Sequence, residues 1–183
     1  SALTTGDWNI AVGADAMKVH TTGARNIAIG HAAMDDTDAG STSLGSTDNI
    51  FMGYAAGGGT WADVASNYNV VIGNYAMDDA LSGALYNVAV GHQAMTDLTS
   101  GDNNVAIGYQ ALFNATTAGS NIAIGRQALN GLTTGGSNTA VGYGALLSLT
   151  SAADGFNVAV GNGAGQNAGP VLGNTYVGFQ AGY

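Results

Sequence analysis

The 183-residue sequence has no cysteine, no glutamate, one proline and only three cations, Lys18, Arg25 and Arg126. The lack of cysteine excludes disulfides, thiolate metal sites and thiol catalysis. Because glutamate and lysine are favoured on exposed helices, their scarcity argues against a helical protein. All 12 acidic residues are aspartate, and the net charge of −9 disfavours nucleic acid as a partner.

Long apolar runs are missing too, although 46% of the residues are hydrophobic. No run approaches the ~20 residues of a membrane span, and no signal-like segment opens the chain, so we expect no membrane insertion by this segment. Only 8% of the residues are charged, and glycine, with 30 residues, is far above its usual share of about 7%. The hydrophobic content is too high for a disordered chain. We therefore expect one domain over residues 1–183.

What the sequence does have is an internal repeat. The pattern Asn-x-x-aliphatic-Gly occurs ten times, most often 17 residues apart, and an alanine stands three residues after every motif glycine. In seven copies the next residue is Met or Leu. Such periodicity is typical of a repeat architecture. The motif begins at Asn9, Asn26, Asn49, Asn69, Asn87, Asn104, Asn121, Asn138, Asn157 and Asn174.

Each motif has the alternation of a short strand. In residues 104–108, Val105 and Ile107 share one face and Ala106 lies on the other. So short a strand is stable only when stacked on its copies, which predicts an all-β parallel β-solenoid of about ten 17-residue coils. We expect Val and Ile to fill its interior, a second short strand with the Met or Leu to close it, and the asparagines to form a hydrogen-bonded ladder.

This assignment puts the small middle residue of each strand on the outside. A stripe of alanines there would be an exposed apolar patch, which favours a subunit interface over a merely tolerated small column. The low charge of the chain points the same way, since a thin monomeric rod needs charged surface to stay soluble. The candidate interface residues are Ala11, Ala28, Ala89, Ala106, Ala123, Ala140 and Ala159.

At residues 103–111 and 138–146, the sequences Asn-Asn-Val-Ala-Ile-Gly-Tyr-Gln-Ala and Asn-Thr-Ala-Val-Gly-Tyr-Gly-Ala-Leu resemble known fibre repeats. The first resembles the YadA-like head of trimeric autotransporter adhesins, and the second resembles repeats of phage tail fibres and other bacterial surface fibres. The resemblance implies a left-handed β-roll, three chains side by side, and adhesion or host recognition outside the cell. The 17-residue unit is longer than the head family's unit of roughly 14 residues, so wider corner loops are expected.

One corner column combines aromatic and polar side chains. The residue after the motif glycine is often His, Tyr or Arg, and glutamine follows it in four copies. Exposed aromatic rings beside amides suit sugar rings, through stacking and hydrogen bonds; the alternative is that the rings only cover the corner or contact a neighbouring subunit. With a tryptophan from an irregular loop, the candidate binding residues are His31, Tyr54, Trp61, His92, Tyr109, Arg126 and Tyr143.

The repeat is interrupted near residues 35–48 and 57–68. Trp61 in the second insertion is either an anchor for a partner or a plug over the core where Gly57 replaces Met or Leu. Asp36 and Asp38 form a fragment of a calcium loop, a weak candidate for a metal site. We expect no catalytic residues and no cofactor, because no hydrolase elbow, zinc motif or nucleotide loop is present.

The sequence thus predicts a non-enzymatic segment of a longer trimeric surface fibre of a bacterium or virion. Its expected partners are two further copies of the chain and a surface receptor on a host or prey cell, most simply a glycan. Two alternatives stay open. Recurring Thr-Thr pairs at one corner would suit an ice-binding solenoid, and carboxylates paired across subunits would suit a tail-spike polysaccharide depolymerase.

Overall fold

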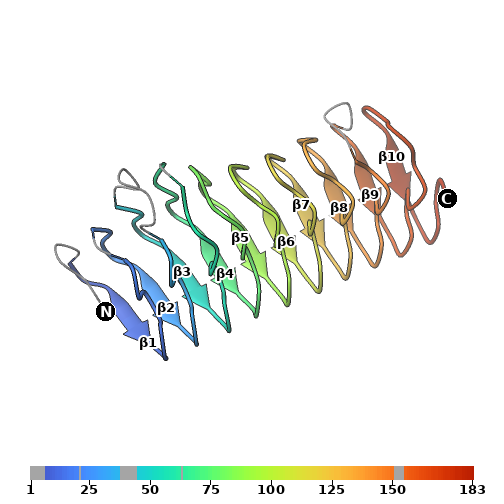
Figure 1. Ribbon diagram of the computed structural model, residues 1–183. Helices are drawn as coiled ribbons and strands as arrows, with labels where there is room; N and C mark the ends of the chain where they lie inside the picture. The colour runs from blue at the N-terminus through green and yellow to red at the C-terminus, as the bar shows by residue number, and fades with distance from the viewer. Residues whose placement is uncertain (1–6, 21, 38–44, 63, 151–154) are drawn as a thin grey trace.

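The computed structural model describes residues 7–20, 22–37, 45–62, 64–150 and 155–183, and within these ranges the regular structure is all strand, with no helix and hence no membrane-spanning helix. Ten three-residue strands form one parallel sheet in chain order. Figure 1 shows them stacked into a rod, with the chain ends at its opposite ends. The strands are β1 (Ile10–Val12), β2 (Ile27–Ile29), β3 (Ile50–Met52), β4 (Val70–Ile72), β5 (Val88–Val90), β6 (Val105–Ile107), β7 (Ile122–Ile124), β8 (Thr139–Val141), β9 (Val158–Val160) and β10 (Thr175–Val177).

Each strand pairs in register with the strand one coil away, as Val88 with Val105 in β5 and β6. The corners pair in the same way: the Met77 amide donates to the Ala94 carbonyl at 3.1 Å. The parallel β-solenoid predicted from the repeat is therefore confirmed. Its ten strands enclose about nine complete coils, slightly fewer than the ten expected, because the last strand opens a coil that the described chain does not close.

The asparagine column forms the predicted ladder inside the molecule. The Asn104 side-chain oxygen accepts from the backbone N–H of Asn121 at 3.0 Å and from its side-chain amide at 3.2 Å. The Asn104 amide donates to the Asn87 oxygen at 3.1 Å and to the Ala118 carbonyl at 2.8 Å. From Asn26 to Asn157 every member of the column is buried, so the ladder satisfies polar groups that would otherwise be unpaired in the core.

The prediction of which strand face lies inside is wrong. The middle residue of the strand points into the core, and eight such side chains have no exposed surface, whereas the flanking aliphatic residues point outward. The eight are the proposed interface alanines except the first, with Phe51 and Val71 added; Ala11, in the first strand, is exposed. Alanines enclosed by their own chain cannot contact another subunit through their side chains. The buried set is Ala28, Phe51, Val71, Ala89, Ala106, Ala123, Ala140 and Ala159.

Narrowness explains the choice of face. The roll has little space between the sheet and the opposite wall, so a Met or Leu from that wall meets a small residue on the strand. The third coil shows the rule by exchange: Phe51 replaces the alanine, Gly57 replaces the Met or Leu, and a Cβ on Gly57 would lie 2.4 Å from the Phe51 ring. A Cβ on Gly182 would likewise lie 2.2 Å from the ring of Tyr176, which stands at the alanine position of β10.

The Met and Leu residues after the second alanine are buried, as predicted, but they lie in turns rather than in a second strand. They have positive φ, for example Met95 at 52° and Leu112 at 51°, an arrangement that L-residues rarely adopt. Leu98, Leu132 and Leu149 add a third inward contact, since all three are fully buried. The stacked corners thus hold a left-handed backbone conformation at the same place in successive coils.

The motif glycine ends the strand because no other residue fits. Gly108 has a φ of 135°, and a Cβ there would lie 2.6 Å from the carbonyl oxygen of Gly125 in the next coil. The column therefore combines a backbone angle that favours glycine with a contact too close for a side chain. It also sets the direction in which the following side chain leaves the sheet.

Candidate functional site

The column after the motif glycine lies on the surface, as the binding-site hypothesis requires. His31, His92 and Arg126 are exposed, and the exposed fractions of Tyr54, Tyr109 and Tyr143 lie between 42% and 45%. The turn at the preceding glycine places these side chains along the same edge of the rod. Six of the seven candidate binding residues therefore share one surface; we call them, with Tyr75, the aromatic ladder.

Successive members of the aromatic ladder touch. His31 stacks on Tyr54 with ring centroids 5.2 Å apart, and His92 stacks on Tyr109 at 5.7 Å. Tyr75, which the sequence analysis missed, joins the two pairs by edge contacts of 5.2 Å to Tyr54 and 5.8 Å to His92. Tyr75 stands one residue past the column. The column position itself is occupied by Asn74, whose side-chain oxygen accepts a hydrogen bond from the backbone amide of Tyr54 at 2.9 Å.

The C-terminal part of the aromatic ladder contains a cation. The guanidinium of Arg126 lies 5.5 Å from the ring centroid of Tyr109 and 5.5 Å from that of Tyr143, one coil to either side. Behind this row the glutamines form their own chain: Gln110 donates to Gln93 at 3.0 Å and Gln127 to Gln110 at 3.2 Å. The column is one continuous surface strip rather than separate side chains.

The close stacking changes what the strip can bind. Centroid distances of 5.2–5.8 Å are those of rings in direct contact, so no sugar ring fits between neighbours. The stacking of sugars on ring faces, one of the two readings left open by the sequence, is therefore blocked within the ladder. What remains available is its outer edge, with hydroxyl, imidazole and guanidinium groups.

Trp61, the seventh candidate, is not on this surface. Its exposed fraction is 1%, its indole N–H donates to the Gly57 carbonyl at 3.1 Å, and its ring contacts Phe51 with centroids 5.5 Å apart. Of the two readings of this residue, the plug over the core is confirmed and the anchor for a partner is wrong. Its bulk fills the space that Gly57 leaves in the third coil.

An acidic corner gathers aspartates from the second, fourth and fifth coils. Burial raises the pKa of Asp78 to about 6, with smaller contributions from Asp35 and Asp79, although the Gly58 amide donates to its carboxylate at 3.1 Å. Burial also raises the pKa of Asp35 and of Asp97. The ionised forms of these carboxyl groups are therefore unfavourable in the folded protein at neutral pH.

The arrangement of side chains at this corner does not support the metal hypothesis. Asp36 accepts a hydrogen bond from the Thr60 hydroxyl at 2.8 Å, and Asp38 lies outside the described residues. Within the described part of the chain, no three His or Asp side chains are placed to share an ion.

A second outward row, which the sequence analysis missed, precedes the asparagine column. Trp8, Tyr68, Tyr86 and Phe156 have exposed fractions of 47–78%, and Tyr68 stacks on Tyr86 with centroids 4.9 Å apart. The signal that could have located it is an aromatic residue directly before the motif asparagine, which recurs in four of the ten coils. With the aliphatic columns between them, the two aromatic rows frame one broad, regular sheet face.

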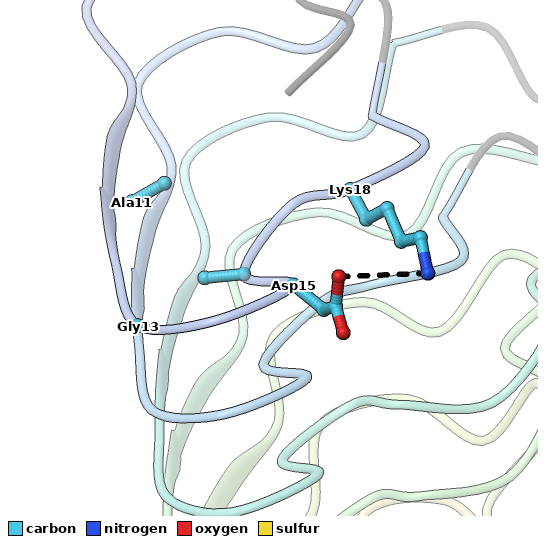
Figure 2. Close-up of a pocket in the computed structure, with 5 residues that line it drawn as sticks. Ala11, Gly13, Asp15 and Lys18 are labelled. Carbon is cyan, nitrogen blue, oxygen red and sulfur yellow. Dashed lines mark ion pairs between the residues drawn. The ribbon is translucent and has the colours of Figure 1, made fainter.

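The pocket in Figure 2 lies at the N-terminal end of the rod, against Ala11, Gly13, Asp15, Ala16 and Lys18. Its volume is about 250 Å³, and an ion pair between Lys18 and Asp15, 3.5 Å apart, borders it. It is the end of the core column that no other described coil covers. Small apolar residues and an already paired charge offer a ligand little to bind.

The Thr-Thr corner has a structural use. The hydroxyl of Thr99 donates to the Thr116 carbonyl at 2.9 Å, that of Thr116 to the Thr133 carbonyl at 3.1 Å, and that of Thr133 to the Thr150 carbonyl. Because these hydroxyls already donate to carbonyls of the next coil, they are not free to donate to ordered water. This argues against the corner as an ice-binding array.

Comparison with known proteins found no match to the chain among family models, curated proteins or solved structures.

Proposed function

We propose that the chain is a structural and adhesive segment of a trimeric surface fibre, in which left-handed β-rolls pack side by side through the outward face of the sheet. The observation that carries the proposal is that face itself. Both outward columns are aliphatic in almost every coil, and none of their residues is buried by the chain. Exposed fractions reach 42% at Ile72, 40% at Val160 and 67% at Val177.

The size of the face suits an interface. Ten strands at about 4.8 Å each give a length of ~48 Å, and the three residues of each strand give a width of ~10 Å. The resulting area of ~480 Å² falls in the range of about 300–600 Å² for the largest apolar patch on a protein surface, which is often functional. So regular an apolar face in a chain with 8% charged residues is therefore a candidate interface.

The number of subunits and the hand of the roll come from the resemblance to YadA-like heads and surface-fibre repeats. In an extracellular fibre, this trimer would present three copies of the aromatic ladder. Three copies would raise the avidity for a repetitive receptor such as a cell-surface glycan. No enzymatic step is part of the proposal.

The test is the mass of the chain in solution by light scattering after size exclusion, together with a variant of the face. A trimer has three times the chain mass of 18.1 kDa. Ile107→Lys, on the outward face of β6, should dissociate it, because a desolvated lysine without a partner opposes association. Ser148→Lys adds the same charge at an exposed position away from the sheet and should leave the trimer intact.

A monomeric wild-type chain would refute the proposal and would favour the ice-binding alternative, since the flat face would then meet water. A trimer that Ile107→Lys and Ser148→Lys affect equally would place the interface elsewhere. A dimer would keep the face as an interface but contradict the fibre architecture.

A further inference from the structure

The charges of the chain are unevenly matched, and one cation is left over. Lys18 pairs with Asp15 at 3.5 Å, and Arg25 pairs with both carboxylate oxygens of Asp48, at 2.6 and 2.7 Å. Among the residues that the structure describes, the guanidinium of Arg126 has neither a carboxylate nor a side-chain hydrogen-bond acceptor as partner. The Arg126 side chain is exposed, and a guanidinium carries five N–H donors.

Arg126 is nevertheless held in place. Tyr109 and Tyr143 contact it from the coils on either side at 5.5 Å, and a cation between two aromatic rings is attracted by both. A guanidinium fixed in this way loses little conformational freedom when it binds a ligand, because its position is set beforehand. The two tyrosine hydroxyls lie on the same exposed strip and add further donors.

Acidic residues avoid this part of the molecule. None of the 12 aspartates lies between positions 103 and 153, so the coils around Arg126 are locally positive in a chain of net charge −9. The last aspartate before that stretch, Asp102, belongs to the opposite corner and accepts a hydrogen bond from the Leu85 amide at 2.8 Å. At physiological ionic strength, charges more than about 8 Å away are largely screened.

We propose that Arg126, together with the hydroxyls of Tyr109 and Tyr143, binds the carboxylate or phosphate group of an acidic saccharide. The planar guanidinium matches either group with two parallel hydrogen bonds. A single cation binds one anionic group of the saccharide at a time, and the blocked ring faces leave polar edges as the means of recognition. The inference rests on the proposed function, because an acidic surface saccharide is what such a fibre would meet.

The experiment measures binding calorimetrically at low ionic strength with defined probes. They are a tetrasaccharide of galacturonic acid, the matching neutral tetrasaccharide of galactose, a galactose phosphate and inorganic phosphate. We expect the two acidic saccharides to bind and the neutral one not to bind. Arg126→Gln should weaken binding at least about 10-fold, as the loss of charge-assisted hydrogen bonds implies. Arg126→Lys should restore part of it, since the charge returns without the fork.

The matched control is Arg25→Gln, which removes the same charge from an exposed arginine on the opposite row. Equal losses in the Arg25 and Arg126 variants would mean attraction by overall charge and would overturn the site. Equal binding of the neutral and acidic tetrasaccharides would overturn the role of the anion, and binding of inorganic phosphate as tight as that of the saccharides would overturn the saccharide.

The outcome is separable from that of the proposed function. A trimer that binds none of the probes refutes the acidic-saccharide site and leaves the fibre standing. A monomer in which Arg126→Gln abolishes binding refutes the fibre and keeps the site.

Discussion

Replacing Asn104 by alanine removes one link of the buried asparagine ladder and measures what holds the coils together. The side chain makes four hydrogen bonds to three residues in the coils on either side. The Asn87 oxygen keeps a second donor, the Asn104 backbone N–H at 3.0 Å, and the Asn121 side-chain amide keeps the carbonyls of Gly119 and Gly135. Two buried groups are left unpaired, the backbone N–H of Asn121 and the carbonyl of Ala118.

Each unpaired buried group costs about 1–3 kcal/mol, so Asn104→Ala should lower the free energy of unfolding by about 2–6 kcal/mol. This is a large part of the 5–15 kcal/mol typical of a domain. The control is Asn174→Ala, just before the last strand, because that side chain donates only a long hydrogen bond of 3.4 Å to the Leu172 carbonyl. The control should cost less than about 1 kcal/mol.

Urea unfolding followed by circular dichroism gives the stability of both variants. Hydrogen exchange by mass spectrometry locates the loss, which should centre on the sixth and seventh coils because each coil of a solenoid contacts only its neighbours. If Asn104→Ala and Asn174→Ala lose equal stability, the ladder is not a source of stability and the reasoning is refuted.

Two further predictions concern the acidic corner and the exchanged core pair. Because the pKa of Asp78 is raised from 3.8 to about 6, the folded protein binds its proton more tightly than the unfolded chain. Stability should therefore fall as pH rises from about 4 to about 7, and Asp78→Asn should make the melting temperature depend less on pH over that range. If the variant and the wild type have the same pH profile, the assignment is refuted. Phe51→Ala should cost about 3–5 kcal/mol through a cavity, Gly57→Met should be destabilising through a clash with Phe51, and the double variant should recover over ~1 kcal/mol relative to their sum. Additive losses in urea unfolding would show that the two positions do not face each other.

Much of the fold follows from the repeat. Every strand falls on the three residues after a motif asparagine, as in Val105–Ile107 after Asn104. The buried ladder, the strand-ending glycines and the inward Met and Leu were likewise predictable, because a column that recurs in every coil must meet its own copies. The repeat also located six of the seven candidate binding residues on one edge. It could not reveal that their rings stack, since this depends on side-chain rotamers.

The sequence by itself determined that the chain stacks as a parallel solenoid and that each strand has an aliphatic face and a small-residue face. Alternation alone does not say which face is inside, because either one is apolar. Only the tertiary structure decided this: the space opposite a Met or Leu is small, so the column that is mostly alanine faces the core, with Val71 fitting opposite Met77, and the Val and Ile columns face outward. The sequence signal of that choice was the paired exchange of large and small residues, Phe51 with Gly57 and Tyr176 with Gly182, which shows that these two columns face each other across the core.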